Sequence, residues 1–378
     1  MPYHPINRNV TVLSHSRAGP DGCTLFDTGG QCCHDWNSSG SARRFAPELR
    51  ETRKLSAFAV HEKRRRSSGS FPEVDWLMAI RKLLLAASMV AAFGLATLDS
   101  NAGATDMPVP SQADWAGAKK TIKLPNGLSL AYVEMGNSDG KPTLLIHGYT
   151  DNSRSWSLMA PFLRDRRLIA IDLRGHGKSD APPCCYAYSD LADDAALFLD
   201  AIGVAKADVI GHSLGSLAAQ LLAAQHPDKV DRLVLVSSTT AVGSAPGSWL
   251  WDNIMPLSPP IDPDSQFMKD WYANPNPVDE DFLARERAES AATPIQVWHG
   301  VLWGMATADL APVSSLVKAP VLVVWGDKDP LFDLSHQEKL EKAYPDAEFE
   351  TFRGAGHNML WEFPEETAKV IASFLDAS

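Results

Sequence analysis

The sequence is poor in cysteine. Of its 5 cysteines, Cys23, Cys32 and Cys33 lie near the N-terminus, and only the adjacent pair Cys184-Cys185 lies in the rest of the chain. One adjacent pair is no disulfide framework, so a fold held together by several disulfides is excluded. The pair leaves two states open, a strained vicinal disulfide or two reduced side chains, and neither cysteine is placed to be a nucleophile.

Positive charge is scarce after residue 104. Residues 105–378 contain 22 Lys and Arg against 37 Asp and Glu, which gives a formal charge of −15. Such a surface repels nucleic acid and anionic lipid, so we expect no nucleic-acid partner. The basic residues gather instead in residues 1–104, which hold 13 Lys and Arg against 9 Asp and Glu.

The sequence also lacks an apolar run that is long enough to cross a membrane. Residues 83–98 are apolar and uncharged, but they number 16 and fall short of the roughly 20 that a spanning helix needs. A basic stretch at 78–82 precedes them, and Ala102-Gly103-Ala104 follows as an A-x-A cleavage site. We therefore predict a signal peptide over 78–104 and a mature N-terminus at Thr105. An uncleaved membrane anchor is the alternative.

This prediction implies a periplasmic or secreted protein with no stable membrane insertion after cleavage. Residues 1–77 then need their own explanation, because they precede the signal peptide and show no sustained helical or strand periodicity. Our hypothesis is that Met78 is the true start and that residues 1–77 are a doubtful leader, either disordered or not translated. A basic disordered arm that binds nucleic acid or membrane is the competing interpretation.

A nucleophile motif stands out in the C-terminal part. Gly211-His212-Ser213-Leu214-Gly215 follows a short apolar run and precedes a helix-like segment, as G-x-S-x-G does in a strand-turn-helix elbow. A chain that turns this sharply at a serine leaves no room for side chains two residues away on either side, so glycine is required there. Ser213 is therefore the predicted nucleophile.

A serine hydroxyl needs a base to take its proton and a carboxylate to orient that base. His357, in the glycine-flanked stretch Gly354-Ala355-Gly356-His357, is the candidate base. The apolar strand-like run 320–325 ends in Gly326-Asp327-Lys328-Asp329, and we choose Asp329 as the acid. Asp327 is its rival, with a turn-capping role as the alternative for that residue.

Acyl transfer also needs backbone N–H donors that face the developing oxyanion. Leu214, directly after the nucleophile, supplies one. The strand-like run 143–146 ends in His147-Gly148, and we assign the second donor to Tyr149. We expect structural roles for His147, His176 and His212, because no other ligand lies at metal spacing, and we expect no metal and no cofactor.

Together these motifs resemble the α/β-hydrolase family over about residues 121–375. The resemblance rests on His147-Gly148, the Asp-Leu-Arg-Gly-His-Gly-Lys-Ser-Asp stretch at 172–180, the elbow, Gly326-Asp327-Lys328-Asp329 and Gly356-His357. The order serine, aspartate, histidine is also that of this family. Within it the chain is similar to the capped esterase, lactonase and cofactor-free haloperoxidase-like branch. The resemblance implies a mostly parallel eight-stranded sheet flanked by helices, with a helical cap insertion.

The chain divides accordingly into a core at 105–241 and 314–378 and a helical cap at 242–313. We expect strands at 128–135, 143–146, 168–172, 208–211, 233–236, 321–325 and 347–352, and helices at 189–202, 213–226 and 364–375. The cap range is rich in aromatic residues, and its candidate substrate-binding side chains are Trp249, Trp251, Trp271, Trp298 and Trp303. For any one of them, packing against the core is the commoner role. Together they predict a substrate with a hydrophobic part.

The sequence therefore predicts an exported serine hydrolase that cleaves a small hydrophobic carboxylic ester or lactone. Three alternatives remain open. The same triad could pass an acyl group to peroxide, as in a cofactor-free perhydrolase or haloperoxidase-like enzyme, or it could cleave a carbon–carbon bond. A non-catalytic ligand-binding α/β-hydrolase is the alternative from a different class. The sequence sets no oligomeric state.

Overall fold

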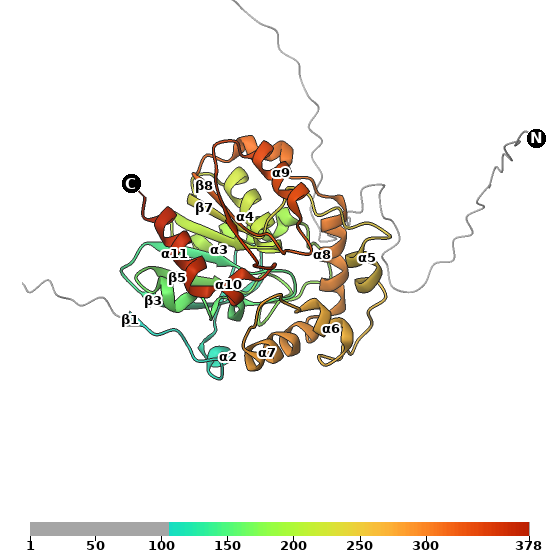
Figure 1. Cartoon of the computed structure of the whole chain (residues 1–378). Coiled ribbons are helices and arrows are strands. Elements are labelled where there is room, and N and C mark those ends of the chain that lie inside the picture. The colour runs from blue at the N-terminus through green and yellow to red at the C-terminus, as the bar shows by residue number, and fades with distance from the viewer. Residues whose placement is uncertain (1–105, 378) are drawn as a thin grey trace, which may run out of the picture. The chain divides into compact units, whose positions relative to one another are not determined.

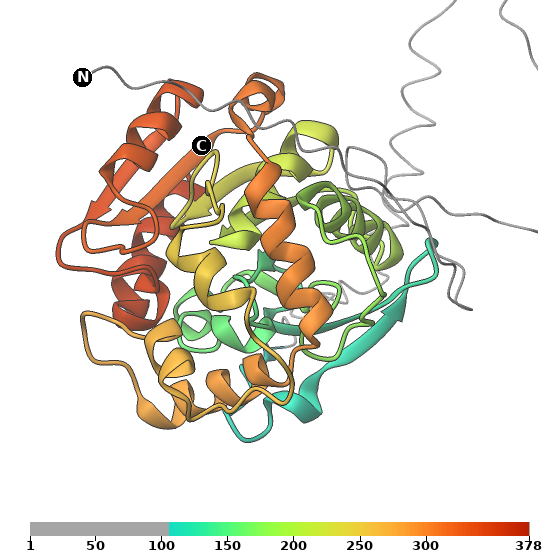
Figure 2. The ribbon, with the colours of Figure 1, turned by 90° about the vertical axis from the view of Figure 1, so that its right-hand side faces the viewer.

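The computed structural model describes residues 106–377, which Figures 1 and 2 show in two views at right angles. These residues form a nine-stranded sheet in the order β1-β3-β5-β4-β6-β7-β8-β9, with β2 paired to β3 beside this path. The strands are β1 (Asp106–Met107), β2 (Lys120–Lys123), β3 (Ser129–Asn137), β4 (Pro142–Ile146), β5 (Arg167–Ile171), β6 (Ala207–His212), β7 (Val230–Val236), β8 (Val321–Gly326) and β9 (Glu348–Phe352). The predicted leader and signal peptide lie outside the described residues.

The central strands owe their position to short apolar runs. In β4, β6, β7 and β8 nearly every residue is buried, on both faces of the strand. Strands of this kind need a parallel sheet with helices over both faces. The pairs from β5 to β9 are indeed parallel, and β3 runs antiparallel to β5. The predicted mostly parallel α/β sheet is therefore confirmed.

The predicted number of eight strands was wrong, because the sheet has nine. The two strands that the sequence did not reveal, β1 and β2, both pair antiparallel with β3 at the N-terminal edge. β1 is only two residues long, and three of the four residues of β2 are exposed. Neither strand carries the buried apolar run or the alternation by which a strand can be recognised in a sequence.

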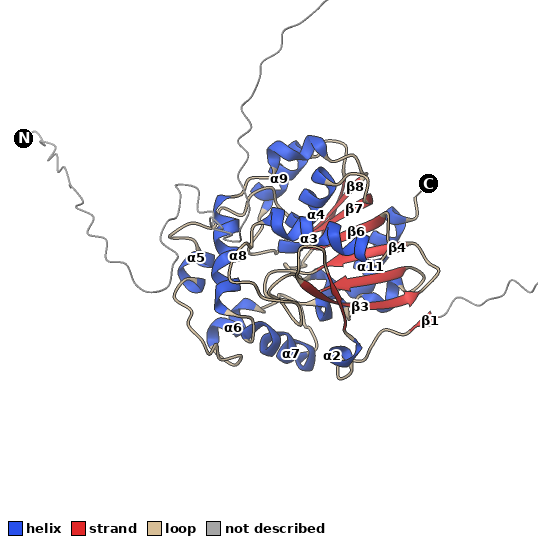
Figure 3. Ribbon diagram, turned by 180° about the vertical axis from the view of Figure 1, so that it is seen from behind, coloured by secondary structure: helices blue, strands red, loops and turns tan. Residues whose placement is uncertain are grey.

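Helices cover both faces of the sheet, as Figure 3 shows. The helices at 189–202, 213–226 and 364–375 that the sequence predicted are α3 (Tyr188–Ala201), α4 (Leu214–Gln225) and α11 (Pro364–Leu375). The shorter elements of the core are α2 (Trp115–Ala118), η1 (Ser153–Trp156), η2 (Ala160–Leu163), α9 (Leu334–Ala343) and α10 (Met359–Glu362). No helix within residues 106–377 is both long and apolar enough to cross a bilayer.

A long segment interrupts the alternation of strands and helices between β7 and β8. This inserted segment, residues 237–320, holds α5 (Trp249–Ile254), α6 (Gln266–Trp271), α7 (Glu280–Ala291), α8 (Ile295–Thr307) and η3 (Ala311–Leu316). Figure 1 shows α5, α6, α7 and α8 gathered at one end of the sheet. The predicted cap range contains all four of these helices.

The carboxyl ends of the central strands meet at one edge of the sheet. Ile146 at the end of β4 pairs with Gly211 in β6, and Gly326 at the end of β8 pairs with Phe352 at the end of β9. The loops that follow β4, β6, β8 and β9 therefore leave from the same edge. Ligand sites of open α/β sheets lie at this edge, and every catalytic residue predicted from the sequence lies in or beside one of these four loops.

Candidate active site

Ser213 occupies a strained turn between β6 and α4. Its backbone has φ +50° and ψ −121°, a conformation that costs a non-glycine residue about 1–3 kcal/mol. A Cβ on Gly211 would lie 2.4 Å from the carbonyl oxygen of Gly215, and a Cβ on Gly215 would lie 2.1 Å from that of Ile146. Both positions therefore need glycine, for the reason that the motif suggested.

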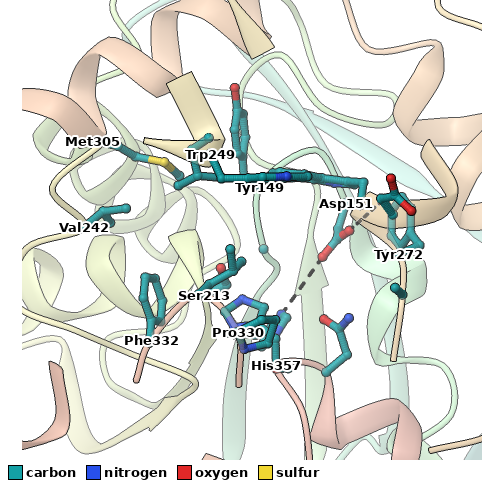
Figure 4. A pocket seen from close by; sticks show the side chains of 18 of the residues that line it. Tyr149, Asp151, Ser213, Val242, Trp249, Tyr272, Met305, Pro330, Phe332 and His357 are labelled. Atoms are coloured by element: carbon teal, nitrogen blue, oxygen red, sulfur yellow. Dashed lines mark hydrogen bonds and ion pairs between the residues drawn. The ribbon is translucent and has the colours of Figure 1, made fainter. Parts of the chain in front are cut away.

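His357 and Asp329 approach Ser213 from the neighbouring loops. The His357 Nδ1–H donates to Oδ2 of Asp329 at 2.8 Å, which leaves Nε2 of the ring as the nitrogen available to a substrate or a nucleophile. Ser213 and His357 both line one pocket of about 520 Å³, which Figure 4 shows from close by. The structure thus brings together the three residues that the sequence proposed for catalysis.

Asp329 is held as a carboxylate. Burial raises its pKa, but the neighbouring His357 and the backbone N–H groups of Phe332 and Leu331 outweigh that effect, so the pKa lies below its ordinary value. Both N–H groups donate to Oδ1, at 3.0 and 2.8 Å. An ionised aspartate in this position orients the imidazole and stabilises the imidazolium form.

Asp327, the rival candidate for the catalytic acid, bonds to a different partner. Oδ1 of Asp327 accepts the backbone N–H of Gly354 at 2.7 Å, so its side chain ties the turn after β8 to the turn after β9. No hydrogen bond joins Asp327 to His357 within residues 106–377. This arrangement corresponds to the turn-capping alternative.

The two residues proposed to supply oxyanion donors lie after neighbouring strands, Tyr149 after β4 and Leu214 after β6. Leu214 is the first residue of α4, and the N–H of a first helical residue has no acceptor within its own helix. Tyr149 lines the pocket, and its hydroxyl donates to the carbonyl oxygen of Trp298. The next residue, Thr150, has φ +66°, which marks a sharp turn of the chain directly after Tyr149.

The three other histidines of the motifs are buried, and burial lowers the pKa of each. His147 accepts the N–H of Leu173 at Nε2 and lies well below its ordinary pKa, while His176 has a pKa of about 4. His212 has a pKa of about 3, and its Nε2–H donates to the carbonyl oxygen of His357 at 3.1 Å. Neutral rings that bond to the backbone fit the structural roles proposed for them. No cluster of three metal-ligating side chains occurs in the part of the chain that the structure describes.

The five tryptophans proposed for substrate contact divide into two groups. Trp249 and Trp271 line the pocket, and their rings stack at an interplanar angle of 10°. Trp298 is fully buried behind Trp271, while Trp251 packs edge-on against Trp303, which is 53% exposed. Trp251, Trp298 and Trp303 are not among the residues that line the pocket.

The pocket has further lining residues that the sequence did not reveal. Some of them are apolar and include Val242, Leu250, Met305, Leu331 and Phe332. Others are polar and include Asp151, Asp270, Tyr272 and Asn358. Two of the polar residues had a signal in the sequence, since Asn358 directly follows His357 and Asp151 lies two residues after Tyr149.

The cysteine pair lies outside this pocket. Cys184 and Cys185 are not joined by a disulfide, their Sγ atoms are 2.7 Å apart, and Cys185 is exposed with φ +75°. Neither cysteine lines the pocket that holds Ser213, so they take no part in the arrangement described above.

Comparison with known proteins identifies the family to which this fold belongs. A model of the "alpha/beta hydrolase fold" family matches residues 141–364. The chain is 31% identical to the 2-(acetamidomethylene)succinate hydrolase of Mesorhizobium japonicum over 63% of this chain and 89% of that protein. It is also 31% identical to Lipase 1 of Psychrobacter immobilis, over 68% of this chain and 85% of the lipase. The crystal structure of an esterase from Rhodococcus sp. ECU1013 is similar, with 28% identity, a TM-score of 0.60, and coverage of 69% of this chain and 99% of the esterase.

The matched range extends from the start of β4 to the first residue of α11, so it includes the elbow, the loops that carry His357 and Asp329, and the inserted segment. It covers more than half of the chain. This chain belongs to the α/β hydrolase fold family.

Proposed function

We propose that this chain hydrolyses a carboxylic ester or lactone with a hydrophobic moiety through a serine nucleophile. One observation carries the proposal: Ser213 sits on a strained elbow in the same pocket as His357, whose Nδ1–H is bonded to the buried carboxylate of Asp329. A serine, a histidine and an aspartate in this relation activate the serine hydroxyl for attack on a carbonyl carbon. The family's esterases and lipases support the same interpretation.

The residues take the following roles. His357 accepts the proton of the Ser213 hydroxyl at Nε2 while Ser213 Oγ bonds to the carbonyl carbon of the substrate. The backbone N–H groups of Leu214 and Tyr149 stabilise the negative charge on the carbonyl oxygen. The imidazolium of His357 then gives its proton to the departing alkoxide, which leaves an acyl-enzyme. Water repeats the sequence, releases the acid and restores Ser213.

The walls of the pocket favour a substrate with an apolar part. Val242, Trp249, Leu250, Met305 and Phe332 all line it, and the first four of these belong to the inserted segment. We propose that this segment acts as a cap that excludes water from the acyl-enzyme and selects the apolar moiety. In the proposed mechanism the triad carries out acyl transfer, the two N–H donors stabilise the oxyanion, and the cap holds the apolar moiety.

We further propose that the enzyme is exported to the periplasm or secreted. The support is the basic, apolar and A-x-A succession in residues 78–104. N-terminal sequencing of the protein recovered from its native cells tests this, because export with cleavage yields a chain that begins at Thr105. Peptides from within residues 1–77 in the recovered protein would overturn both the cleavage and the view of that stretch as a doubtful leader.

The catalytic proposal is tested with p-nitrophenyl esters from acetate to decanoate and with a set of lactones. The full chain is compared with Ser213→Ala and with Ser373→Ala, which changes an exposed serine of α11 that does not line this pocket. We expect turnover that Ser213→Ala abolishes and Ser373→Ala retains. Equal turnover in the two variants, or none in a correctly folded parent on any ester or lactone, would contradict the proposal.

A further inference from the structure

The acidic residues that line the pocket have no basic counterpart among the described lining residues. Asp151 and Asp270 line it, and none of the described residues that line it is a lysine or an arginine. The histidines in the lining are His212 and His357, and the first of these is neutral because burial lowers its pKa to about 3. No permanently positive side chain of this described lining can therefore receive an anionic group of a substrate.

Asp151 is the buried member of the acidic pair. Only 5% of Asp151 is exposed, and its Oδ1 accepts the hydroxyl of Tyr272 at 2.9 Å. Its Oδ2 lies 4.0 Å from Nδ1 of His212. That nitrogen has no hydrogen-bond partner among the described residues. A Cβ on Gly148 would lie 2.7 Å from Asp151 Oδ2 and 3.0 Å from His212 Nδ1, so the absence of a side chain there makes room for both.

The carboxyl group of Asp151 lies across Ser213 from the apolar wall. Figure 4 shows Val242, Met305 and Phe332 on one side of Ser213 and Asp151 with Tyr272 on the other, and its dashed lines mark the contacts of Asp151. The nucleophile thus stands between an apolar region and a polar region. A bound substrate must place one part on each side of its scissile bond.

The described residues that face Asp151 supply no fixed positive charge. Tyr272 faces it from the end of α6, Glu286 from α7, His212 from β6, and His357 from the loop after β9. Glu286 is itself buried, and neither of its carboxyl oxygens has a hydrogen-bond partner within residues 106–377. Burial accordingly raises the pKa of Asp151 to about 7, so the group is neutral below that pH and negative above it.

We propose that Asp151 is a specificity-determining residue that rejects substrates with a negative charge beside it and accepts a hydroxyl, an amide or a cationic group there. The inference rests on the proposed ester hydrolysis and adds a substrate class to it. Neutral or cationic esters and lactones, apolar on one side of the scissile bond and polar on the other, fit the pocket. An ester with a carboxylate on the polar side meets a second carboxylate in a site of low dielectric constant.

Two pairs of substrates test the proposal, whichever side of the pocket takes the acyl group. One pair is the p-nitrophenyl monoester of adipic acid and its methyl ester, which differ in charge at the end of the acyl chain. The other is the butyrate ester of hydroxybenzoic acid and its methyl ester, which differ in charge on the leaving group. The measured quantity is the ratio of kcat/KM, neutral over anionic, for the full chain and for Asp151→Asn.

In at least one pair we expect the wild-type ratio to be about tenfold or more at about pH 8 and to fall by several-fold in Asp151→Asn. The wild-type ratio should also rise between about pH 6 and pH 8 as Asp151 ionises, and this rise should be absent from the variant. An unchanged ratio in both pairs for an Asp151→Asn protein that hydrolyses the neutral esters would overturn the proposal. If the wild type hydrolyses none of these esters, that result would instead contradict the proposed function itself.

Asp270→Asn provides the matched comparison. Its carboxylate lines the same pocket but is exposed and bonds to Gln266 of its own helix at 2.8 Å, so solvent screens its charge. We expect the ratio to change less than in Asp151→Asn, and an equal change would refute the assignment to Asp151. Should Asp151→Asn fail to fold, Asp151→Ser removes the same charge with a smaller side chain, and the same ratios decide the question.

Discussion

Two buried aspartates, one bonded to His357 and one in the lining of the pocket, differ in the direction in which their pKa is shifted. Asp329 is 6% exposed and Asp151 is 5% exposed, so burial alone would raise both pKa values. Asp329 nevertheless lies below its ordinary pKa, because His357 and two backbone N–H groups donate to it. For Asp151 the hydroxyl of Tyr272, the charge of His357 and the backbone of Gly148 also favour the ionised form, but burial outweighs them and its pKa rises to about 7. The donors around a buried carboxyl, more than its depth, decide its charge.

The comparison also separates two tasks of the pocket. On the catalytic side a permanent carboxylate is needed to hold the imidazolium of His357. On the polar side of the pocket, a carboxyl that carries its charge only above about pH 7 can exclude anions and still bond to neutral groups. The predictions below alter one side at a time and compare the results.

The largest expected effect comes from Asp329→Asn. An asparagine keeps the size of the side chain but cannot stabilise the imidazolium, and it favours the wrong tautomer of His357. We expect kcat on p-nitrophenyl esters to fall by about 10³ to 10⁴. Asp327→Asn, which alters the turn-capping carboxylate two residues away, should reduce kcat far less. A larger loss in Asp327→Asn would reverse the assignment of the acid.

The second expected effect is on stability and depends on pH. Asp151 has its ordinary pKa of 3.8 when unfolded and about 7 when folded, so between these values the folded protein keeps a proton that the unfolded chain has released. Its contribution to the free energy of unfolding therefore falls as the pH rises from about 4 to 7, by an amount on the order of a few kcal/mol. Asp151→Asn should remove this fall.

Asp329 should act in the opposite sense, because its folded pKa is lowered. It contributes stability above its unfolded pKa, and this contribution is lost as the pH falls through the folded value. Denaturant titrations of the wild type, Asp151→Asn and Asp329→Asn over about pH 2 to 8 give the two differences, that of Asp151 between about pH 4 and 7 and that of Asp329 below about pH 4. If the wild type and Asp151→Asn keep a constant difference in free energy over this range, the raised pKa of Asp151 is wrong.

The catalytic side could be predicted from the sequence because its constraints are local. A sharp turn at Ser213 demands glycine at 211 and 215, and an apolar run followed by Gly326-Asp327-Lys328-Asp329 marks a strand end with carboxylates. These requirements act within a few residues, so they leave a pattern. The edge strand β2 is short and mostly exposed and leaves none, and the strand count was wrong for that reason.

The polar side of the pocket, around Asp151, depends on contacts between segments that are distant in the sequence. Tyr272 and Asp151 are 121 residues apart, and nothing near Asp151 in the sequence indicates that hydroxyl. The tryptophans show a second cause. Trp249 and Trp251 lie two residues apart on α5, and at about 100° per residue they point to opposite faces of the helix, so only one can face the pocket. The composition of the segment predicted an apolar wall but not which rings would form it.

The third prediction concerns the packing that holds Ser213. In Gly215→Ala the new Cβ would lie 2.1 Å from the carbonyl oxygen of Ile146 in β4, so α4 and β4 must move apart. We expect a loss of about 1–3 kcal/mol in the free energy of unfolding and a lower kcat, since the elbow moves with the helix. Gly117→Ala in α2 is the control, because the new Cβ meets no atom from elsewhere in the fold within 4 Å, and helix propensity predicts an unchanged stability or a gain of up to about 1 kcal/mol. Equal losses in both variants would mean that the elbow is less tightly packed than described.

The smallest expected effect, and the sharpest test of the polar side, is that of Tyr272→Phe. The substitution removes the hydroxyl that donates to Asp151 Oδ1 at 2.9 Å and leaves the ring in place beside Trp361. Because that hydrogen bond favours the ionised carboxyl, its loss should raise the pKa of Asp151 further. The pH at which the enzyme begins to reject the anionic ester should therefore move upward by about one unit, with little change in kcat/KM for the neutral ester. A shift to lower pH would show that the hydroxyl of Tyr272 stabilises the protonated form of Asp151, and the explanation offered for its charge would have to be reversed.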